Sequence, residues 1–463
     1  MARSETRVDP SPPKPGDDAA TRRGLSAGQA WYAVAVLTLA NVSGSIDRQI
    51  FTSLVGPVKR DLGLTDTQVS LLSGFGFSVF FAIFGLFIGR MVDRRRRNVI
   101  VAVGAAMWSV LTALTGITRS YGQLMLARVG VGVGEATLSP AAVSVIADAF
   151  PRRRLGTAMS VYMLGTFLGS GVSYALGAWM VTKAEATGMV TLPLVGAVYP
   201  WQTVFFVIGL PGLLVALLAL TMREPVRATG TRTMDAVPLR QVMAYMRGNA
   251  RTMIAICAGY TCSASVNWGV GFWLQAFFVR THGWSIAQAG TLQGGLTIVI
   301  GPIGTLLGGW LSDRYTQRGM VDAPLRVGML GAAGMLVFAG LYPVVPSATV
   351  AAALLVPVNL FAALPWGAAN VAIAEAMPSR LRGQGSALFQ LMVGLAGGIG
   401  PTAVALITDR GFGDDAALRW SLSLCTVVGM ALTLGLLAWG RPAYRATVAR
   451  RDESRERAQA GAR

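Results

Sequence analysis

The sequence carries few charged residues for its length. They make up 13% of its 463 residues, whereas soluble domains carry roughly 25%. Hydrophobic residues reach 53% of the chain, and the mean hydropathy is +0.53. This scarcity of charge excludes an ordinary soluble protein and predicts a membrane protein.

Cysteine and histidine are also scarce. The three cysteines, Cys257, Cys262 and Cys425, lie in apolar runs and form no C-x-x-C pair, which excludes a disulfide framework and argues against metal or redox chemistry. The single histidine, His282, is expected to be an exposed loop residue. The sequence has no ATPase phosphate loop and no nucleophile–base pair, so neither an enzyme nor a bound cofactor is expected.

Long apolar runs recur along the chain, each able to cross the ~30 Å core of a bilayer. The longest polar connection, 222–249, is a predicted cytosolic linker between an N-terminal half (30–221) and a C-terminal half (250–440). A disordered polar tail is predicted at 1–29 and a basic, partly helical tail at 441–463. The twelve predicted spans cover 30–54, 67–91, 98–117, 121–148, 156–181, 200–221, 250–279, 286–311, 326–344, 348–376, 384–408 and 418–440.

The positive charge follows the membrane topology. If the N-terminus is cytosolic, two arginines lie within spans, Arg48 and Arg128, and most other basic residues fall on the inner side. The basic residues outside are Lys59, Arg60, Arg119, Lys183, Arg280, Arg410 and Arg419. This bias satisfies the positive-inside rule with both termini cytoplasmic. It accounts for the net charge of +18 without a nucleic-acid partner.

The two halves repeat one another. The loop G-R-M-V-D-R-R-R-R at 89–97 recurs as G-W-L-S-D-R-Y-T-Q-R at 309–318, 220 residues later. The junction A-D-A-F-P-R-R-R-L-G at 147–156 recurs as A-E-A-M-P-S-R-L-R-G at 374–383, 227 residues later. Two repeated six-span halves predict a substrate site near the bilayer midplane and alternating access by rocking of the halves.

The repeated G-x-x-x-D-R-x-x-R loop resembles the signature loop of the major facilitator superfamily. Within that superfamily, D-R at 47–48 and R-V-G-V-G-V-G-E-A-T-L-S-P-A-A at 128–142 resemble the Spinster family. The resemblance implies an all-α membrane fold of twelve helices in two pseudo-symmetric halves, and a monomer. It also implies proton-linked transport of lysolipids or sphingoid phosphates. All but three of the 40 basic residues are arginine, which indicates a GC-rich bacterial genome and hence the bacterial inner membrane.

Four charged residues lie within the spans away from their ends, and all belong to the N-terminal half: Asp47, Arg48, Arg128 and Glu135. Charges at membrane depth are costly and usually functional. Two helical turns separate Arg128 from Glu135, so they share one face of the fourth span. The adjacent pair in the first span points about 100° apart and needs at least two partners.

These charges predict a coupling site. Burial favours a neutral carboxylic acid, and a nearby arginine favours the carboxylate, so Glu135 and Asp47 are the candidate proton carriers. Arginine binds phosphate or carboxylate in a bidentate manner, so Arg128 and Arg48 are the candidate anion ligands. A permanent salt-bridge network that only holds the first and fourth spans together is the alternative.

The corresponding positions of the C-terminal half are neutral. Adding 220 to Asp47 and Arg48 gives Asn267 and Trp268, and adding 227 to Glu135 gives Ala362. The C-terminal half is therefore expected to supply apolar and neutral polar contacts. Its candidate substrate ligands are Asn267, Trp268 and Asn370.

A further set of charged residues lies at the predicted cytosolic ends of the spans. Those in the repeated loops would pair across helix ends and hold an inner gate closed. Two acids at equivalent positions near the cytosolic ends of the fourth and tenth spans would pair with loop arginines of their own half. The candidate gate residues are Asp93, Arg97, Asp313, Arg314, Asp148 and Glu375.

The sequence as a whole predicts a proton-coupled transporter of an amphiphilic anion, such as a lysolipid or a sphingoid-like lipid. A proton-coupled carrier of small organic anions or drugs is the alternative, because Arg48 and Arg128 would bind a soluble carboxylate equally well. A transporter-like sensor is a remote third class, because neither tail carries a signalling domain.

Overall fold

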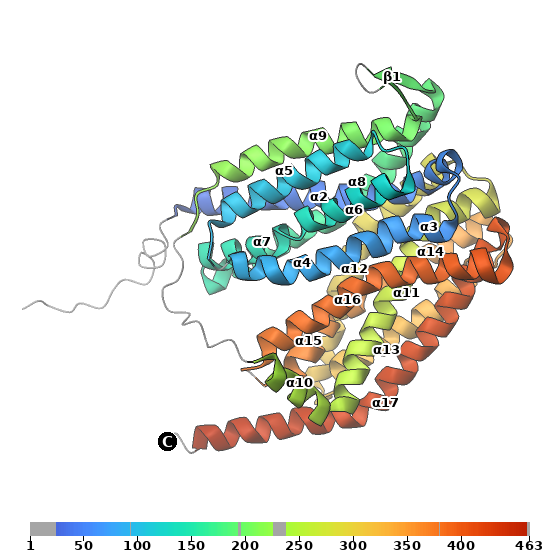
Figure 1. Ribbon diagram of the computed structural model, residues 1–463. Coiled ribbons are helices and arrows are strands. Elements are labelled where there is room, and N and C mark those ends of the chain that lie inside the picture. The colour runs from blue at the N-terminus through green and yellow to red at the C-terminus, as the bar shows by residue number, and fades with distance from the viewer. Residues whose placement is uncertain (1–24, 93, 193–195, 226–237, 379, 461–463) are drawn as a thin grey trace, which may run out of the picture.

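The computed structural model describes the chain except residues 1–24, 93, 193–195, 226–237, 379 and 461–463. Ten helical stretches of the described residues are long and apolar enough to cross a membrane. The remaining two predicted spans, 30–54 and 250–279, lie in the helices α2 (Ala27–Leu62) and α11 (Ala250–His282). The predicted all-α membrane fold is therefore confirmed (Figure 1).

The N-terminal half places each of its six predicted spans on helical elements. The second span joins three short elements, and the fourth is divided in two. After α2 the elements are α3 (Asp66–Ser70), η1 (Leu71–Phe75), α4 (Gly76–Val92), α5 (Arg97–Thr115), α6 (Tyr121–Glu135), α7 (Leu138–Ala149), α8 (Arg152–Thr187), β1 (Val190–Leu192), β2 (Gly196–Val198) and α9 (Pro200–Thr221). The two strands form a small antiparallel hairpin beyond the spans.

The C-terminal half repeats this arrangement. Its tenth span is divided at the place that corresponds to the division of the fourth. The elements are α10 (Leu239–Gly248), α11, α12 (Ile286–Gln317), α13 (Ala323–Gly334), η2 (Met335–Ala339), α14 (Ala348–Ala363), α15 (Pro365–Ala376), α16 (Arg382–Leu406), η3 (Ile407–Phe412), η4 (Asp415–Ala417) and α17 (Leu418–Ala460). The predicted linker thus contains the short helix α10, and the predicted basic tail continues α17.

Local sequence signals set the helix ends. Ser26 caps α2, where its hydroxyl accepts a hydrogen bond from Gln29 N and the Gln29 side chain accepts one from Ser26 N. Ser285 and Gln288 form the same capping box on α12. Gly63 ends α2 with a φ of 63°, a left-handed conformation that glycine adopts without strain. Because these caps and not the apolar run set its ends, α2 extends well beyond the run that predicts it.

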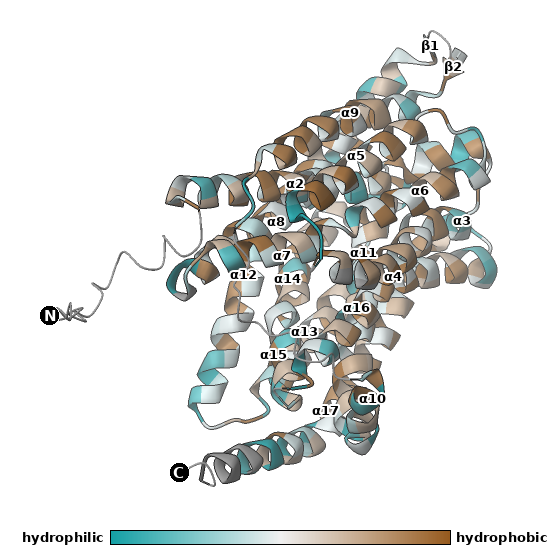
Figure 2. Cartoon of the chain, turned by 60° about the vertical axis from the view of Figure 1, so that its left-hand side comes forward, coloured by the Kyte–Doolittle hydropathy of each residue, from teal (hydrophilic) through white to brown (hydrophobic). Residues whose placement is uncertain are grey.

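The helix ends define two faces of the molecule. We name the face that carries Ala27 and the end of α17 the terminal face, and the other the opposite face. The two halves lie side by side, and their helices diverge toward the terminal face (Figure 1). Apolar residues cover most of α5 and α9, whereas the last part of α17 is hydrophilic (Figure 2).

Glycines bring the two halves into backbone contact. A Cβ atom on Gly398 of α16 would lie 2.8 Å from Phe75 Cα in η1, and one on Gly74 would lie 3.0 Å from Gly398 Cα. At the second crossing, a Cβ on Gly294 of α12 would lie 2.5 Å from Gly171 O in α8. Any larger residue would separate these helices, so close packing of the halves depends on glycine.

Candidate functional site

Arg48 of α2 and Glu135 of α6 form an ion pair through Arg48 Nη1 and Glu135 Oε2. Arg48 Nη2 also donates a hydrogen bond to Ser45 Oγ at 2.9 Å. The Arg48 side chain is 21% exposed, whereas the Glu135 side chain is 1% exposed. Arg48 is thus the member of the pair that a solute can reach.

Asp47 contacts a different set of groups. Its Oδ2 accepts a hydrogen bond from Thr112 Oγ1 of α5, and its Oδ1 lies 3.9 Å from Arg128 Nη1 of α6. Oδ1 has no hydrogen-bond partner within the described part of the chain. The adjacent residues Asp47 and Arg48 therefore meet two different partners, as the rotation along a helix requires.

Arg128 is enclosed by aromatic rings. Its guanidinium carbon lies 5.3 Å from the centroid of Phe51 and 5.8 Å from that of Phe77, distances at which an aromatic face attracts a cation. The side chain is 1% exposed, and its Nε has no hydrogen-bond partner among the described residues. Arg128 is thus out of direct reach of solvent, unlike Arg48.

A helix interruption follows Glu135 directly. The chain leaves α6 at Glu135 and enters α7 at Leu138, close to Pro140, which lacks the N–H that would bond back to residue 136. The C-terminal half repeats the break between α14 and α15, next to Pro365. Discontinuous helices mark binding sites in many transporters. The two prolines are the signal in the sequence from which the break could have been predicted.

The candidate ligands of the C-terminal half lie on two different helices and differ in burial. Asn267 and Trp268 are half-buried on α11, and Asn267 Nδ2 donates to Ala362 O at 3.4 Å. Asn370 of α15 is exposed and accepts a hydrogen bond from Gln390 Nε2 at 2.9 Å. The structure thus separates Asn370 from the other two and adds Gln390, which the sequence did not indicate.

The candidate gate residues that the structure describes form no ion pair across the halves. Asp93 lies outside the described residues. Arg97 is buried in its own half, where its Nη1 lies 2.5 Å from Asp148 Oδ2 and its Nε lies 2.9 Å from Glu224 Oε1. The repeat predicts a pair between Arg97 and Asp148 within the N-terminal half, and the structure contains this contact. Arg97 therefore makes its ion pairs within its own half of the molecule and not with the C-terminal half.

The equivalent residues of the C-terminal half behave differently. Asp313 and Arg314 are exposed on the last turns of α12, which continues to Gln317 instead of ending near 311 as predicted. The Arg314 guanidinium lies over the Trp310 ring at 5.3 Å. Glu375 accepts a hydrogen bond from Tyr444 at 2.8 Å, so its described partner is a tyrosine of α17 rather than a loop arginine.

Charged residues join the halves on the opposite face. Both terminal guanidinium nitrogens of Arg280 in α11 donate hydrogen bonds to the carboxylate of Asp66 in α3, at 2.5 and 2.8 Å. Lys59 lies 2.9 Å from Asp66 and 2.6 Å from Asp415, and Thr67 donates to Asp409 at 2.7 Å. We name these residues the charged latch: Lys59, Asp66, Thr67, Arg280, Asp409 and Asp415.

The sequence indicated the cations of this latch without their partners. Lys59 and Arg280 are two of the basic residues that the predicted topology places outside, against the general bias. Asp66, Asp409 and Asp415 have ligand atoms within 4.8 Å of one another. Lys59 and Arg280 supply two positive charges against these three carboxylates.

Comparison with known proteins decides the family. Residues 37–401 match the Major Facilitator Superfamily. The chain belongs to the major facilitator superfamily. As a major facilitator it is a multi-pass membrane transporter, and not an enzyme.

Two named proteins are similar to this major facilitator. It is 27% identical to protein spinster homolog 1 of Homo sapiens over 467 residues, 94% of this chain and 84% of that protein. It is 30% identical to an MFS-type efflux pump of Mycolicibacterium smegmatis over 297 residues, 63% of this chain. That match spans 64% of the efflux pump's own length.

A solved structure supports the Spinster resemblance of this major facilitator. The crystal structure of a bacterial homologue of the human lysosomal transporter Spinster, inward-facing and unoccupied, superposes with a TM-score of 0.74. The two chains are 25% identical, and the match covers 92% of this chain and 99% of the other. The predicted resemblance to Spinster proteins is confirmed.

Proposed function

We propose that this transporter moves an amphiphilic anion, such as a lysolipid or a sphingoid-like lipid, by proton-coupled alternating access. The observation that carries the proposal is the Arg48–Glu135 pair, in which the arginine is accessible and the acid is buried. An anionic headgroup that approaches this pair meets the cation first. It can therefore compete with Glu135 for Arg48.

Such competition would couple the substrate to a proton. When the anion takes Arg48, the Glu135 carboxylate loses its counter-charge in a low-dielectric site and binds a proton, which makes it neutral. When the anion leaves, Arg48 returns to Glu135 and the proton is released. The second pair, Asp47 and Arg128, keeps its Thr112 and aromatic contacts and holds α2 against α5 and α6.

We further propose that the terminal face lies in the cytosol of a bacterial cell and that the structure is an inward-facing state of a monomeric carrier. The charge distribution supports the orientation. The charged latch joins the halves on the opposite face, while the helices diverge toward the terminal face (Figure 1). The superposition on a structure described as inward-facing supports the same assignment.

A proton-coupled carrier of small organic anions or drugs is a second candidate. The similarity to an MFS-type efflux pump favours it. Arg48 would bind a soluble carboxylate as readily as a lipid headgroup. The size and the apolar tail of the substrate therefore separate the two candidates, whereas the coupling chemistry does not.

The test uses purified protein in liposomes with an imposed proton gradient. Movement of a labelled lysophospholipid is compared with that of a labelled small carboxylate, for the wild type, Glu135→Gln and the control Glu185→Gln. Glu185 pairs with Arg60 at the far end of α8. We expect gradient-driven lysolipid movement that Glu135→Gln loses and Glu185→Gln keeps.

Two results would revise the proposal. Movement of the carboxylate alone would assign the function to the second candidate. Unchanged gradient dependence in Glu135→Gln would exclude Glu135 as the coupling acid.

A further inference from the structure

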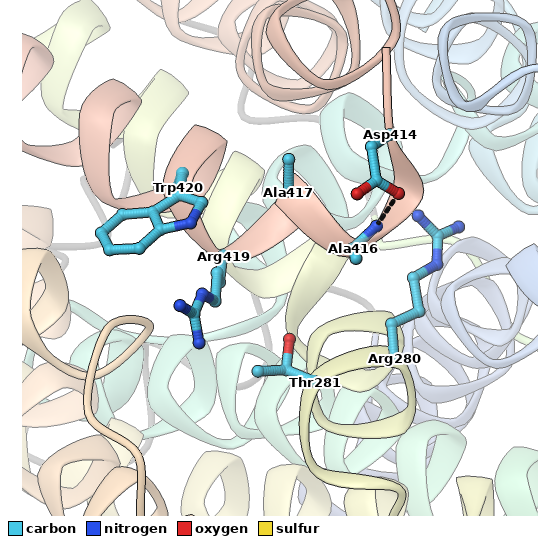
Figure 3. A pocket seen from close by; sticks show the side chains of 7 residues that line it. All are labelled: Arg280, Thr281, Asp414, Ala416, Ala417, Arg419 and Trp420. Atoms are coloured by element: carbon cyan, nitrogen blue, oxygen red, sulfur yellow. Dashed lines mark hydrogen bonds between the residues drawn. The ribbon is translucent and has the colours of Figure 1, made fainter. Parts of the chain in front are cut away.

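A pocket of about 320 Å³ opens on the opposite face, away from the coupling site (Figure 3). It lies between the end of α11, which contributes Arg280 and Thr281, and the start of α17, which contributes Arg419 and Trp420. The volume is large enough for a phosphate or carboxylate group with part of the molecule that carries it.

Arg419 gives this pocket an available cation. Its guanidinium carbon lies 4.6 Å from the centroid of Trp420, and it forms no ion pair with the residues that the structure describes. A guanidinium held against a ring keeps its N–H donors at the edge, in the plane where a bidentate acceptor binds. The hydroxyl of Thr281 also has no hydrogen-bond partner among those residues.

The one acid that lines the pocket is turned to the backbone. Asp414 accepts a hydrogen bond from Ala416 N at 2.9 Å, drawn as a dashed line in Figure 3. It thereby caps the short helix η4. Asp414 reduces the positive potential of the pocket, but it does not pair with Arg419.

Arg280 belongs both to the pocket and to the charged latch. Its two terminal nitrogens bind Asp66 of the N-terminal half, while its side chain lines the pocket on the C-terminal half. Any anion in the pocket that attracts the Arg280 guanidinium must compete with Asp66 for it. The latch contact between the halves would weaken as the anion binds.

We propose that this pocket binds an oxyanion, a phosphate or a carboxylate group, at Arg419, across the pocket from Arg280 (Figure 3), and that the negative charge of the bound group loosens the charged latch. Thermodynamic linkage makes the effect reciprocal: an anion that favours the open latch binds more tightly when the latch is already weakened. This site does not depend on which molecule crosses the membrane or on coupling at Glu135. Its failure and that of the proposed function are therefore separate results.

The test measures binding of inorganic phosphate to the full-length protein in phosphatidylcholine nanodiscs by calorimetry. Arg419→Gln should lower the affinity at least about tenfold, since a hydrogen bond to a charged group contributes ~1.5–3 kcal/mol. Arg410→Gln is the matched control, because it removes the same charge from the same face outside the pocket. Asp66→Asn should tighten phosphate binding several-fold, because it removes the competing charge.

Each outcome decides a part of the proposal. Equal affinity in the wild type and Arg419→Gln, or an equal loss in Arg410→Gln, would reject the pocket as the site. Unchanged affinity in Asp66→Asn would reject the competition with the latch. Repeating the titration in nanodiscs that contain phosphatidylglycerol distinguishes the sources: weaker apparent phosphate binding identifies a lipid headgroup as the occupant, and equal binding identifies a water-borne anion.

Discussion

At the scale of single residues, the two arginines of the proposed coupling site differ in access. Arg48 is partly exposed and pairs with Glu135, whereas Arg128 is enclosed by Phe51 and Phe77. The sequence identified all four charged residues, because a charge in an apolar run is conspicuous. It did not distinguish the two arginines, because access depends on side chains that the fold brings from other spans.

Arg48→Gln should therefore weaken anion binding more than Arg128→Gln does. We expect a loss of about tenfold for Arg48→Gln, the size of one charged hydrogen bond. Equilibrium binding of a labelled anionic substrate to protein in detergent measures it. A larger loss in Arg128→Gln, with the protein still folded, would place the anion against Arg128 instead.

Thr112 is a residue of this site that the sequence did not reveal. Its hydroxyl is the only described hydrogen-bond donor to Asp47. Thr112→Val keeps the shape of the side chain and removes the donor, which should cost about 1–3 kcal/mol because a buried acceptor loses its partner. Thermal unfolding in detergent should show the loss.

Thr112→Ser provides the control for this prediction. Serine retains the hydroxyl and should restore most of the stability. If Thr112→Ser is as unstable as Thr112→Val, the methyl packing matters and the hydrogen bond does not.

At the scale of elements, the apolar runs placed all twelve spans on helices but did not give their ends. Hydropathy records which residues meet lipid, and a helix continues into water until a cap ends it. Thus α2 continues to Leu62 and α12 to Gln317. The helix α10 and the hairpin of β1 and β2 were missed because they lie in the connections between the predicted spans.

Asp322 is one of the residues that hold the C-terminal part of α17, together with the Tyr444–Glu375 hydrogen bond. Asp322, between α12 and α13, is buried and lies 2.6 Å from Arg441, 2.9 Å from Arg445 and 3.1 Å from Arg326. Burial alone would raise the pKa of Asp322, but the hydrogen bonds from these arginines outweigh it and lower the pKa to about 2. The helix contains Pro442 and bends before its C-terminal end (Figure 1).

This clamp predicts a pH dependence. Because the pKa of Asp322 falls from its ordinary value of 3.8 to about 2, the clamp should be fully formed above about pH 4 and be lost as the pH falls toward 2. Asp322→Asn should release the end of α17 even at neutral pH. Limited proteolysis at the arginines of that helix, faster in Asp322→Asn, measures the release.

Asp452→Asn is the control for the clamp. Asp452 pairs with Arg451 on the exposed side of the same helix, so its loss should leave the cleavage rate unchanged. Equal cleavage of the wild type and Asp322→Asn would show that other contacts hold the helix.

At the scale of the whole molecule, the identified ion pairs between the halves gather on the opposite face. The repeat in the sequence predicted two halves and a gate, but placed the gate residues on the terminal face. A transporter of this kind closes the terminal face in one state and the opposite face in the other. The same sequence adopts both states, so sequence periodicity cannot tell which face is closed in a given structure. All the latch residues except Thr67 also lie outside the predicted spans, where no apolar pattern draws attention to them.

Lys59→Gln should shift the equilibrium away from the state in which the opposite face is closed. It removes the ion pairs of Lys59 with Asp66 and Asp415, which together contribute about 1–2 kcal/mol in a partly exposed setting. Spin labels at Asp61→Cys and Phe412→Cys, with the three native cysteines replaced, should report a longer distance in this variant. Lys183→Gln, on the same face outside the latch, should leave the distance unchanged.

The four charges of the proposed coupling site should also determine the response to membrane voltage. Two acids and two arginines sum to zero, and one bound proton plus one monoanion leaves that sum unchanged. Movement of the loaded site through the membrane field would then require no electrical work. A dianion with one proton would leave one net negative charge, whose electrical work is ~2.3 kcal/mol per 100 mV. Transport of a singly charged lysolipid should therefore be indifferent to a potassium diffusion potential, and a dependence on that potential would reveal a second proton or an unpaired charge.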